Sequence, residues 1–167
     1  MTDLTQKAQK IKLLLTDCDG VLTDGGVYYS ANGEELKKFN LRDGMGVERL
    51  RKLCGIDTGI VTGENSPIVS RRAEKQQNKH LHLGVKDKKQ CLTQILLSLN
   101  LSADEIAYIG DDRNDYEVIQ MAGLTASPAD GDSLIKETVH YICTQSGGAG
   151  AFREFAELII KLRTLNT

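Results

Sequence analysis

Apolar runs that end in polar residues alternate along this chain with segments whose apolar residues recur three or four positions apart. The runs have the length expected of buried strands, and they lie at residues 11–17, 57–62, 81–85, 106–110, 124–126 and 140–143. The segments have the spacing of amphipathic helices, and they lie at residues 43–54, 66–75, 86–99, 116–122, 133–137 and 151–162. This alternation predicts right-handed β-α-β units, and hence a Rossmann-like, doubly wound parallel sheet of the α/β class.

Local signals indicate where several elements begin and end. Asp43 is placed to cap the helix that runs to residue 54. Asn32-Gly33, between two β-prone segments, predicts a hairpin at about residues 26–40 that protrudes after the first strand. Residues 147–150 are rich in glycine and predict a flexible link within a C-terminal tail and helix at about residues 146–164.

The bulk composition narrows the class of protein. The chain of 167 residues fits one domain, residues 1–167, and no linker indicates a second. The net charge is -2 without a cluster of Lys or Arg, which argues against nucleic acid as a partner. No apolar stretch approaches the roughly 20 residues of a membrane span, and residues 1–12 lack the apolar core of a signal peptide. The four cysteines are widely spaced, which is typical of reduced thiols in a cytoplasmic protein.

Carboxylates follow two of the predicted strands. Asp17 and Asp19 close the first strand, and Asp111, Asp112 and Asp115 follow the fourth. Because the carboxyl ends of parallel strands share one edge of a sheet, these side chains are expected to lie close together. In an extended chain, residues two positions apart point the same way, so Asp17 and Asp19 are expected on one side. These carboxylates repel one another unless a cation lies between them, and an all-oxygen set favours Mg²⁺ over Zn²⁺.

Two further strand ends add groups that suit a phosphoryl ligand. Thr62 and Gly63 follow the second strand with a hydroxyl and an exposed backbone amide, and Lys88 lies at the start of the helix after the third. Taken alone, Thr62-Gly63 indicates almost nothing, and Lys88 is more typical of a solvated helix position. Together with Mg²⁺ and a nucleophilic carboxylate, they predict a pocket that shares the charge of a transferring phosphoryl group.

The motifs resemble those of the haloacid dehalogenase superfamily. They are Asp-Cys-Asp-Gly-Val-Leu-Thr-Asp-Gly at residues 17–25, Thr62-Gly63, Asp87-Lys88, and Gly110-Asp111-Asp112 with Asp115. The hairpin, residues 39–44 and residues 147–154 are similar to the 3-deoxy-D-manno-octulosonate 8-phosphate phosphatase group, and this likeness covers nearly the whole chain. The resemblance implies an HAD-like fold without a cap domain. It also implies a phosphatase for a keto-deoxy sugar acid phosphate that serves lipopolysaccharide biosynthesis.

The resemblance implies roles for three of the acidic residues. Asp17 is similar to the family nucleophile, which forms an aspartyl-phosphate. Asp19 is similar to the acid/base that first protonates the leaving alcohol and then activates water. Asp111 matches a Mg²⁺ ligand, together with Asp17 and the backbone carbonyl of Asp19.

The same resemblance assigns the groups around the phosphoryl. Thr62 and Lys88 match the hydroxyl and the cation that hold it. Asp115 resembles a supporting carboxylate that orients Lys88 or a metal-bound water, and Asp112 is grouped with it as a further supporting residue.

The segments between the motifs are too short to hold a cap over this site. The resemblance therefore implies a homotetramer, in which a neighbouring subunit covers each site and the hairpins assemble together. The glycine-rich tail is expected to reach an adjacent site. Removal of the chain from Gly147 onward is accordingly expected to lower activity on the natural substrate without unfolding the domain.

The substrates of the group carry a carboxylate, which Arg binds in bidentate fashion. The candidates to meet it are Arg42, Arg72, Lys75 and Arg153. Glu64 departs from the pattern, because the octulosonate phosphatases usually carry Arg after the Thr-Gly pair. Glu64 followed by Arg72 and Lys75 is more similar to phosphatases for nine-carbon 9-phosphates of the 2-keto-3-deoxynononic and sialic acid type. An eight-carbon substrate is the first expectation, and a nine-carbon one is the alternative.

Two other classes of protein are consistent with part of this pattern. A response-regulator-like phosphoacceptor also combines acidic residues, Mg²⁺, Thr and Lys, but it has no need of a second carboxylate two residues after the acceptor. A non-catalytic oligomerisation module predicts the loss of a motif residue, and every motif residue is present. His80 and His82 could form a metal pair, but without a third ligand nearby they are more typical of a strand surface.

Overall fold

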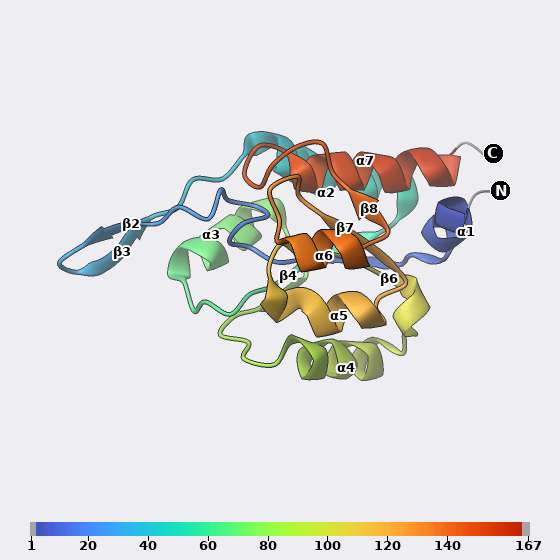
Figure 1. Ribbon diagram of the computed structural model, residues 1–167, viewed down its shortest axis with the longest axis horizontal. Coiled ribbons are helices and arrows are strands. Elements are labelled where there is room, and N and C mark those ends of the chain that lie inside the picture. Colours follow the sequence, from blue (N-terminus) through green and yellow to red (C-terminus); the bar gives the residue numbers. More distant parts are fainter. Residues whose placement is uncertain (1–2, 165–167) are drawn as a thin grey trace.

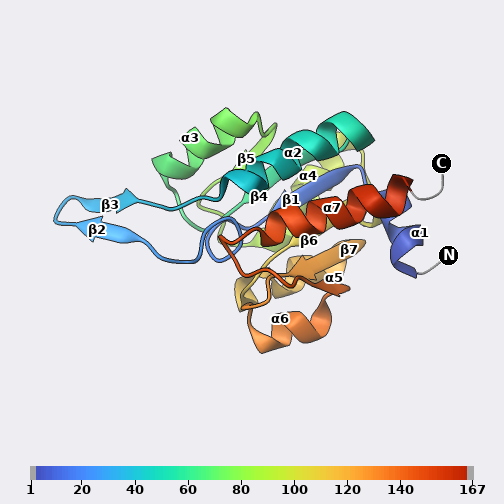
Figure 2. The same ribbon diagram turned by 90° about the horizontal axis from the view of Figure 1, so that it is seen from above.

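A six-stranded parallel sheet lies at the centre of the molecule, with helices on both of its faces (Figure 1, Figure 2). The computed structural model describes residues 3–164. The strands run in the order β5-β4-β1-β6-β7-β8, and every neighbouring pair is parallel. Their bounds are β1 Leu13–Thr16, β4 Asp57–Val61, β5 His80–His82, β6 Ile106–Ile109, β7 Leu124–Ser127 and β8 Tyr141–Ile142. The predicted doubly wound α/β sheet is confirmed, although β5 and β8 are shorter than the apolar runs that predicted them.

β1 lies in the middle of the sheet, where the winding of the chain reverses. Leu13 pairs with Asp57 of β4 on one side and with Ile106 of β6 on the other. From β1 the chain moves outward through β4 and β5, then crosses over to β6 and continues to β7 and β8. The carboxyl ends of β1 and β6 therefore flank the position at which doubly wound sheets bind their ligands.

Two helical layers cover the sheet. One consists of α1 Asp3–Lys10, α2 Leu41–Cys54, α3 Pro67–Gln76 and α7 Ala151–Thr164, and the other of α4 Lys88–Leu99, α5 Tyr116–Met121 and α6 Ser133–Thr138. Short 3₁₀ turns, Ala103–Glu105 and Arg113–Asp115, precede β6 and α5. Leu14 packs against the first layer, whereas Leu13 and Leu15 pack against the second. Burial on both faces explains why the central strands β1 and β6 consist mainly of apolar residues. None of the helices within residues 3–164 is long and apolar enough to cross a membrane.

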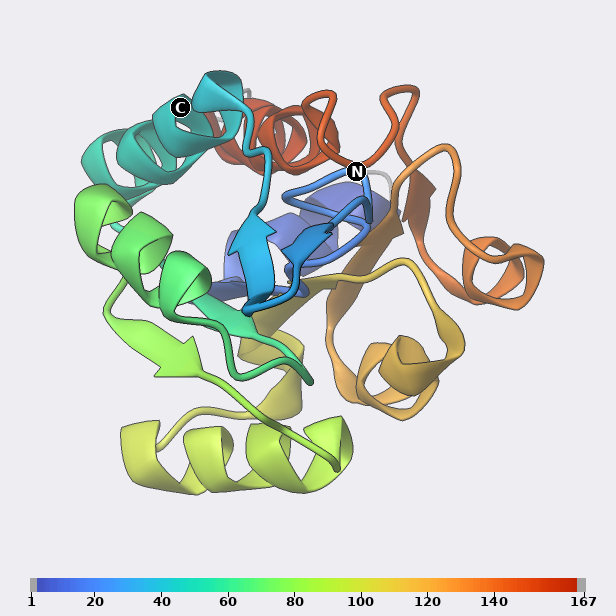
Figure 3. The same cartoon turned by 90° about the vertical axis from the view of Figure 1, so that its left-hand side faces the viewer.

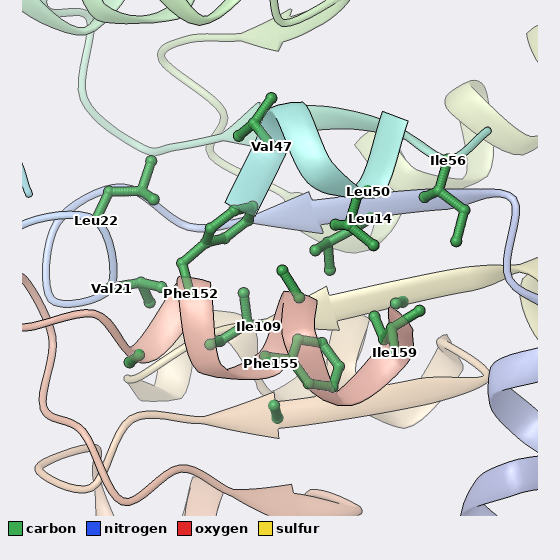
Figure 4. Packing of buried hydrophobic residues seen from close by; sticks show 14 of the residues in the cluster. Leu14, Val21, Leu22, Val47, Leu50, Ile56, Ile109, Phe152, Phe155 and Ile159 are labelled. Carbon is green, nitrogen blue, oxygen red and sulfur yellow. The ribbon is translucent and has the colours of Figure 1, made fainter. Parts of the chain in front are cut away.

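The C-terminal helix α7 is part of the main hydrophobic core (Figure 4). Its Phe152, Phe155 and Ile159 are buried and belong to the same cluster as Leu14 of β1 and Leu50 of α2. Figure 4 shows these side chains between α2, α7 and the sheet. The helix is therefore a layer of the domain and cannot be regarded as an appended tail.

The glycine turn before α7 is anchored to the body of the domain. The backbone N–H of Gly147 donates a hydrogen bond to Asp130 Oδ1 at 2.9 Å, and that of Gly148 donates to the carbonyl of Val21 at 3.0 Å. A Cβ atom at Gly147 would lie 1.9 Å from the carbonyl oxygen of Gly20, so only glycine permits this approach. The structure thus shows a packed turn where a flexible link was expected.

A chain that ends after Ser146 is expected to lose its cooperative fold, contrary to the expectation that the tail is separable. Truncation of a single buried Phe to Ala costs about 3–5 kcal/mol, whereas a whole domain is stable by only about 5–15 kcal/mol. Loss of α7 removes Phe152 and Phe155 together and uncovers one face of the sheet. A thermal melt followed by circular dichroism measures the effect. Wild-type melting of the shortened chain would contradict it.

The start of α2 differs from the expectation that Asp43 caps this helix. Asn40 has an extended backbone, and its side-chain oxygen accepts a hydrogen bond from the N–H of Arg42 at 2.9 Å. Asp43 lies buried in the first turn, where its Oδ1 accepts a hydrogen bond from the backbone N–H of Arg153 at 3.0 Å. Because Arg153 lies in the first turn of α7, Asp43 caps the neighbouring helix instead of its own.

The predicted hairpin protrudes from the carboxyl edge of the sheet (Figure 1, Figure 2), and Figure 3 shows it end-on in front of the sheet. It consists of β2 Tyr28–Ser30 and β3 Gly33–Leu36, which pair antiparallel. Within residues 3–164, this hairpin is the one element inserted between β1 and α2. Its Tyr28, Tyr29 and Leu36 are 64%, 71% and 63% exposed, so the arm presents apolar side chains to the outside.

Candidate active site

Side chains from the ends of β1 and β6 meet the start of α4 at the switch point of the sheet. Asp17 directly follows β1, Asp111 lies shortly after β6, and Lys88 begins α4. Single carboxylate oxygens of Asp17, Asp111 and Asp115 all lie within 4.8 Å of one another. The fold thus gathers charged groups from three distant parts of the chain at one point.

Lys88 is the buried cation of this cluster. Its side chain is 3% exposed, and its Nζ lies 2.9 Å from Asp17 Oδ2 and 2.7 Å from Asp115 Oδ1. The Tyr108 hydroxyl also donates to Asp115 Oδ1 at 2.6 Å, and the backbone N–H of Asp111 donates to Asp115 Oδ2 at 3.0 Å. With donors on both of its oxygens, Asp115 is suited to fix Lys88 beside Asp17.

Two glycines make room for the carboxylates. A Cβ atom at Gly20 would lie 1.9 Å from Asp111 Oδ2, and one at Gly110 would lie 2.5 Å from Asp115 Cγ. Gly20 also has a φ of +89°, in the region that favours glycine. The glycine in each acidic motif is therefore required by the close approach of a carboxylate.

Burial and the charges of neighbouring groups shift the pKa values of Asp17, Asp111 and Lys88. Burial, together with the charge of Asp115, raises the pKa of Asp17 to about 7, although Lys88 lowers it. Burial and the charges of Asp17 and Asp115 raise the pKa of Asp111 to about 8. Burial lowers the pKa of Lys88, but Asp17 and Asp115 more than offset this and raise it. One ammonium group therefore does not neutralise the three carboxylates.

The residues present fit a divalent cation. Oδ1 of Asp111 is buried and has no hydrogen-bond partner among residues 3–164. Asp17 and Asp111 offer carboxylate oxygens only, the ligands that Mg²⁺ prefers, and few enough of them to leave positions for water or substrate. Asp115 is within reach of the same point, but its oxygens are already held by donors.

The affinity for Mg²⁺ is expected to rise with pH between 6 and 8. In the metal-free protein Asp17 and Asp111, with pKa values of about 7 and 8, hold protons that a cation must displace. Each displaced proton makes affinity increase roughly tenfold per pH unit below the pKa of its group. Calorimetric titrations at both pH values, in buffers of different ionisation enthalpy, measure the affinity and the protons released. Equal affinity at pH 6 and 8 would contradict the expectation.

The other predicted catalytic residues lie around this cluster. Thr62 directly follows β4 and is buried, and its Oγ1 accepts a hydrogen bond from the N–H of Glu64 at 3.3 Å. Asp19 lies in the turn of residues 18–23 and is not part of the group formed by Asp17, Asp111 and Asp115, and its carboxylate lies 2.5 Å from Lys37 Nζ. Asp112 is exposed and caps the 3₁₀ turn that follows it.

The predicted substrate-binding residues are distributed over three separate hollows. Arg42 and Arg153 line one of about 420 Å³, and Arg72 and Lys75 line another of about 560 Å³ between α2 and α3. Glu64, which follows Gly63, lines a third of about 300 Å³ with Glu34 and Glu35. Arg72 lies over the ring of Phe39, with 5.4 Å to its centre, and donates to the carbonyl of Asn40. Asp17 lines none of the three.

Sequence reasoning missed two residues that contact the acidic groups. Tyr108 lies within an apolar strand, where its hydroxyl is the one sign of a polar partner. Lys37 lies at the base of the hairpin, and no spacing rule relates it to Asp19. His80 and His82 lie on β5, and they belong to no group of three potential metal ligands among residues 3–164.

The chain also matches known proteins. Residues 62–153, more than half of its length, match the family model described as haloacid dehalogenase-like hydrolase. The 3-deoxy-D-manno-octulosonate 8-phosphate phosphatase KdsC of Yersinia pestis is 39% identical over 158 residues, which are 95% of this chain and 84% of that protein.

Two solved structures share the fold at similar identity. The 3-deoxy-D-manno-octulosonate 8-phosphate phosphatase of Moraxella catarrhalis, in complex with magnesium ion, phosphate ion and a KDO molecule, is 38% identical with a TM-score of 0.93, covering 98% of this chain and 93% of its own. The cobalt-bound enzyme of Haemophilus influenzae is 36% identical with a TM-score of 0.91, and the match covers 95% of this chain and 92% of that one. This chain therefore belongs to the haloacid dehalogenase-like hydrolases, in the family of the 3-deoxy-D-manno-octulosonate 8-phosphate phosphatases.

Proposed function

We propose that this protein is a Mg²⁺-dependent phosphatase that hydrolyses 3-deoxy-D-manno-octulosonate 8-phosphate to 3-deoxy-D-manno-octulosonate and phosphate, in lipopolysaccharide biosynthesis. The observation that carries the reaction is the buried contact of Lys88 with Asp17 at the switch point, beside Asp111. The sugar is supported by relatives named for this activity, of which the one from Yersinia pestis is 39% identical over 95% of the chain.

The mechanism begins at Asp17. A carboxylate oxygen of Asp17 attacks phosphorus and forms an aspartyl-phosphate, while the carboxyl group of Asp19 gives its proton to the leaving alcohol. Asp19 then takes a proton from water, which attacks the same phosphorus and releases phosphate and free Asp17. When bound, Mg²⁺ neutralises negative charge on the phosphoryl oxygens and on the carboxylates that face them.

The remaining residues bind and orient. We assign the Mg²⁺ to Asp17, Asp111 and the backbone carbonyl of Asp19. Thr62, the backbone at Gly63, and Lys88 hold the phosphoryl oxygens, and Asp115 orients Lys88. Asp112 supports the turn that carries Asp115.

A nine-carbon 9-phosphate is the second candidate substrate, and the observation that favours it is Glu64. Its side chain lies in a hollow with two more carboxylates, Glu34 and Glu35, where the octulosonate enzymes usually have the cation of an Arg. Glu64, Arg42, Arg72, Lys75 and Arg153 are proposed to meet the sugar acid.

A phosphate-release screen over phosphorylated sugar acids with Mg²⁺ tests the function. The eight-carbon 8-phosphate is expected to give the highest kcat/KM, with simple monoesters far below it. A clear preference for the nine-carbon 9-phosphate would replace the proposed substrate. Absence of phosphate release from every compound would overturn the proposed activity and favour a non-catalytic module.

The protein is expected to be a homotetramer, with the exposed apolar side chains of the hairpin buried between subunits. Tyr28, Tyr29 and Leu36 are large apolar side chains that a monomer would leave in water. A cover supplied by a neighbouring subunit would also exclude water from a site over which residues 3–164 place no cap domain. Sedimentation of the wild-type protein and of Tyr29→Ser with Leu36→Ser measures the mass of each. A wild-type monomer would contradict the expectation.

A further inference from the structure

The base of the hairpin carries a buried cation that the proposed mechanism does not use. Lys37 directly follows β3, and its side chain is only 1% exposed. Its Nζ lies 2.5 Å from Asp19 Oδ1 and 3.3 Å from Glu34 Oε2. Burial lowers the pKa of Lys37, but the hydrogen bonds and charges of Asp19 and Glu34 more than offset this and raise it. Lys37 is therefore a hydrogen-bond donor that is held between the hairpin and Asp19.

Glu34 joins this contact to the body of the domain. Its Oε1 accepts a hydrogen bond from the hydroxyl of Ser66, which is buried at the N-terminal cap position of α3. A serine at such a position usually accepts a hydrogen bond from its own helix, but the side chain of Ser66 makes none. Its hydroxyl is committed to the hairpin instead, so one chain of polar contacts connects α3, the hairpin and Asp19.

The two oxygens of Asp19 have different environments. Oδ1 is held by Lys37, whereas Oδ2 is buried and has no hydrogen-bond partner among residues 3–164. Asp19 lies in a turn rather than in the sheet, so the backbone alone does not fix its side chain. A general acid must be held within hydrogen-bond reach of the atom it protonates. The Lys37 contact supplies such a restraint on Oδ1 and leaves Oδ2 without a partner among residues 3–164.

We propose that Lys37 is a positioning residue that holds the Asp19 carboxyl group by one oxygen, so that the other gives its proton to the leaving alcohol. This inference rests on the proposed function. In the step concerned, a bond forms between an Asp17 oxygen and phosphorus, and the bond between phosphorus and the alcohol oxygen breaks. The bonding electrons remain on the alcohol oxygen, which takes the proton from Asp19 Oδ2, and Asp19 is left as a carboxylate.

The dependence of rate on the leaving group separates this role from a structural one. An acidic phenol such as 4-nitrophenol leaves without a proton, whereas an alkyl alcohol needs one. The parameter kcat/KM reports the first chemical step only, so the later attack of water does not affect it. If the carboxyl group of Asp19 is no longer held in position, kcat/KM must therefore fall far more for an alkyl ester than for an activated aryl ester.

The experiment measures kcat/KM of the full-length enzyme with Mg²⁺ for 4-nitrophenyl, phenyl and benzyl phosphate, none of which carries a carboxylate. Lys37→Met is expected to lose about 100-fold on benzyl phosphate and less than about fivefold on 4-nitrophenyl phosphate, as for impaired general-acid catalysis. Lys37→Arg is expected to recover most of the loss. The control Lys38→Met removes the next lysine, which is 67% exposed and paired with Asp24, and is expected to match the wild type.

A second variant covers the case in which Lys37→Met does not fold. Glu34→Gln weakens the hold on Lys37 from its other side and is expected to give the same selectivity for the activated ester with a smaller loss. Equal losses on all three esters, or no loss, in the folded variants would overturn the inference and leave the proposed phosphatase in place. A wild-type enzyme inactive on every ester and on the sugar acid phosphates would overturn both.

Discussion

Asp17→Asn is expected to release no measurable phosphate from any monoester, with kcat/KM at least about 10⁴-fold below wild type. Asn keeps the size of the side chain and can still accept a hydrogen bond from the N–H of Cys18, which lies 2.7 Å from Asp17 Oδ1. What it lacks is the anionic oxygen that attacks phosphorus. Mg²⁺-dependent phosphate release, measured on the preferred sugar acid phosphate and on 4-nitrophenyl phosphate, checks the expectation.

The same variant is expected to be at least as stable as the wild type in metal-free buffer at pH 8. Burial and Asp115 raise the pKa of Asp17 to about 7, so its ionised form is costly in the folded protein. A neutral amide removes that cost. The matched control is Asp24→Asn, which changes an exposed carboxylate of the same loop and should keep wild-type turnover. If Asp17→Asn released phosphate as fast as the control, Asp17 would not be the nucleophile.

The sheet and the meeting of its strand ends follow from short-range patterns, and this is why they could be predicted. Leu13, Leu14 and Leu15 are buried on alternate faces under two helical layers, which leaves an unbroken apolar run in the sequence. Once the strands are known to be parallel, Asp17 and Asp111 must lie at the same edge. Gly20 and Gly110 are consistent with this arrangement, because each faces a carboxylate that a Cβ atom would displace.

Contacts between distant side chains could not be predicted in this way. The prediction that Asp17 and Asp19 lie on one side assumes an extended chain, whereas the strand ends at Thr16 and a turn follows, so this rule does not extend to Asp19. Capping rules consider only residues that are close in sequence, so they predict that Asp43 caps its own helix. They cannot predict its hydrogen bond with Arg153 of α7, which is distant in sequence. No sequence pattern indicates a role for Lys37, because Asp19 becomes its neighbour only when the hairpin folds back.

The substrate-binding residues show a different limit. Arg42, Arg72, Lys75 and Arg153 were proposed from residue chemistry, which identifies groups that suit a carboxylate but not where they lie. The structure places them in two hollows apart from Asp17, with Arg72 engaged by Phe39 and Asn40 of its own chain. Contact with the sugar acid therefore stays a prediction for each of these residues.

Lys88→Met is expected to lower kcat/KM by about 10²–10³-fold, because a preorganised charge is lost from the phosphoryl site. It is also expected to destabilise the metal-free protein by about 3–5 kcal/mol, the typical effect of removing one partner from a buried ion pair. The side chain of Lys88 is 3% exposed and contacts Asp17 and Asp115, which would then face each other without a cation.

The pH dependence of that destabilisation identifies its cause. Without Lys88, whose charge lowers the pKa of Asp17, that pKa must rise further above about 7. The folded variant then binds a proton that the unfolded chain releases near its ordinary pKa, so the stability of the variant falls as pH rises from 6 to 8. Lys88 itself stays charged throughout this range, because its pKa is raised in the folded protein. Thermal melts at both pH values should therefore show a wider gap from wild type at pH 8, and added Mg²⁺ should narrow it.

A lysine of the same helix provides the comparison. Lys89 is 53% exposed and lies 3.3 Å from Glu117, so Lys89→Met should change stability by less than about 1 kcal/mol at either pH, as for an exposed ion pair. A gap between Lys88→Met and wild type that is equal at pH 6 and 8 would mean that lost packing, rather than uncompensated carboxylates, destabilises the variant. In that case the cluster would not need a cation to be stable, and the argument for Mg²⁺ from repulsion would fail with it.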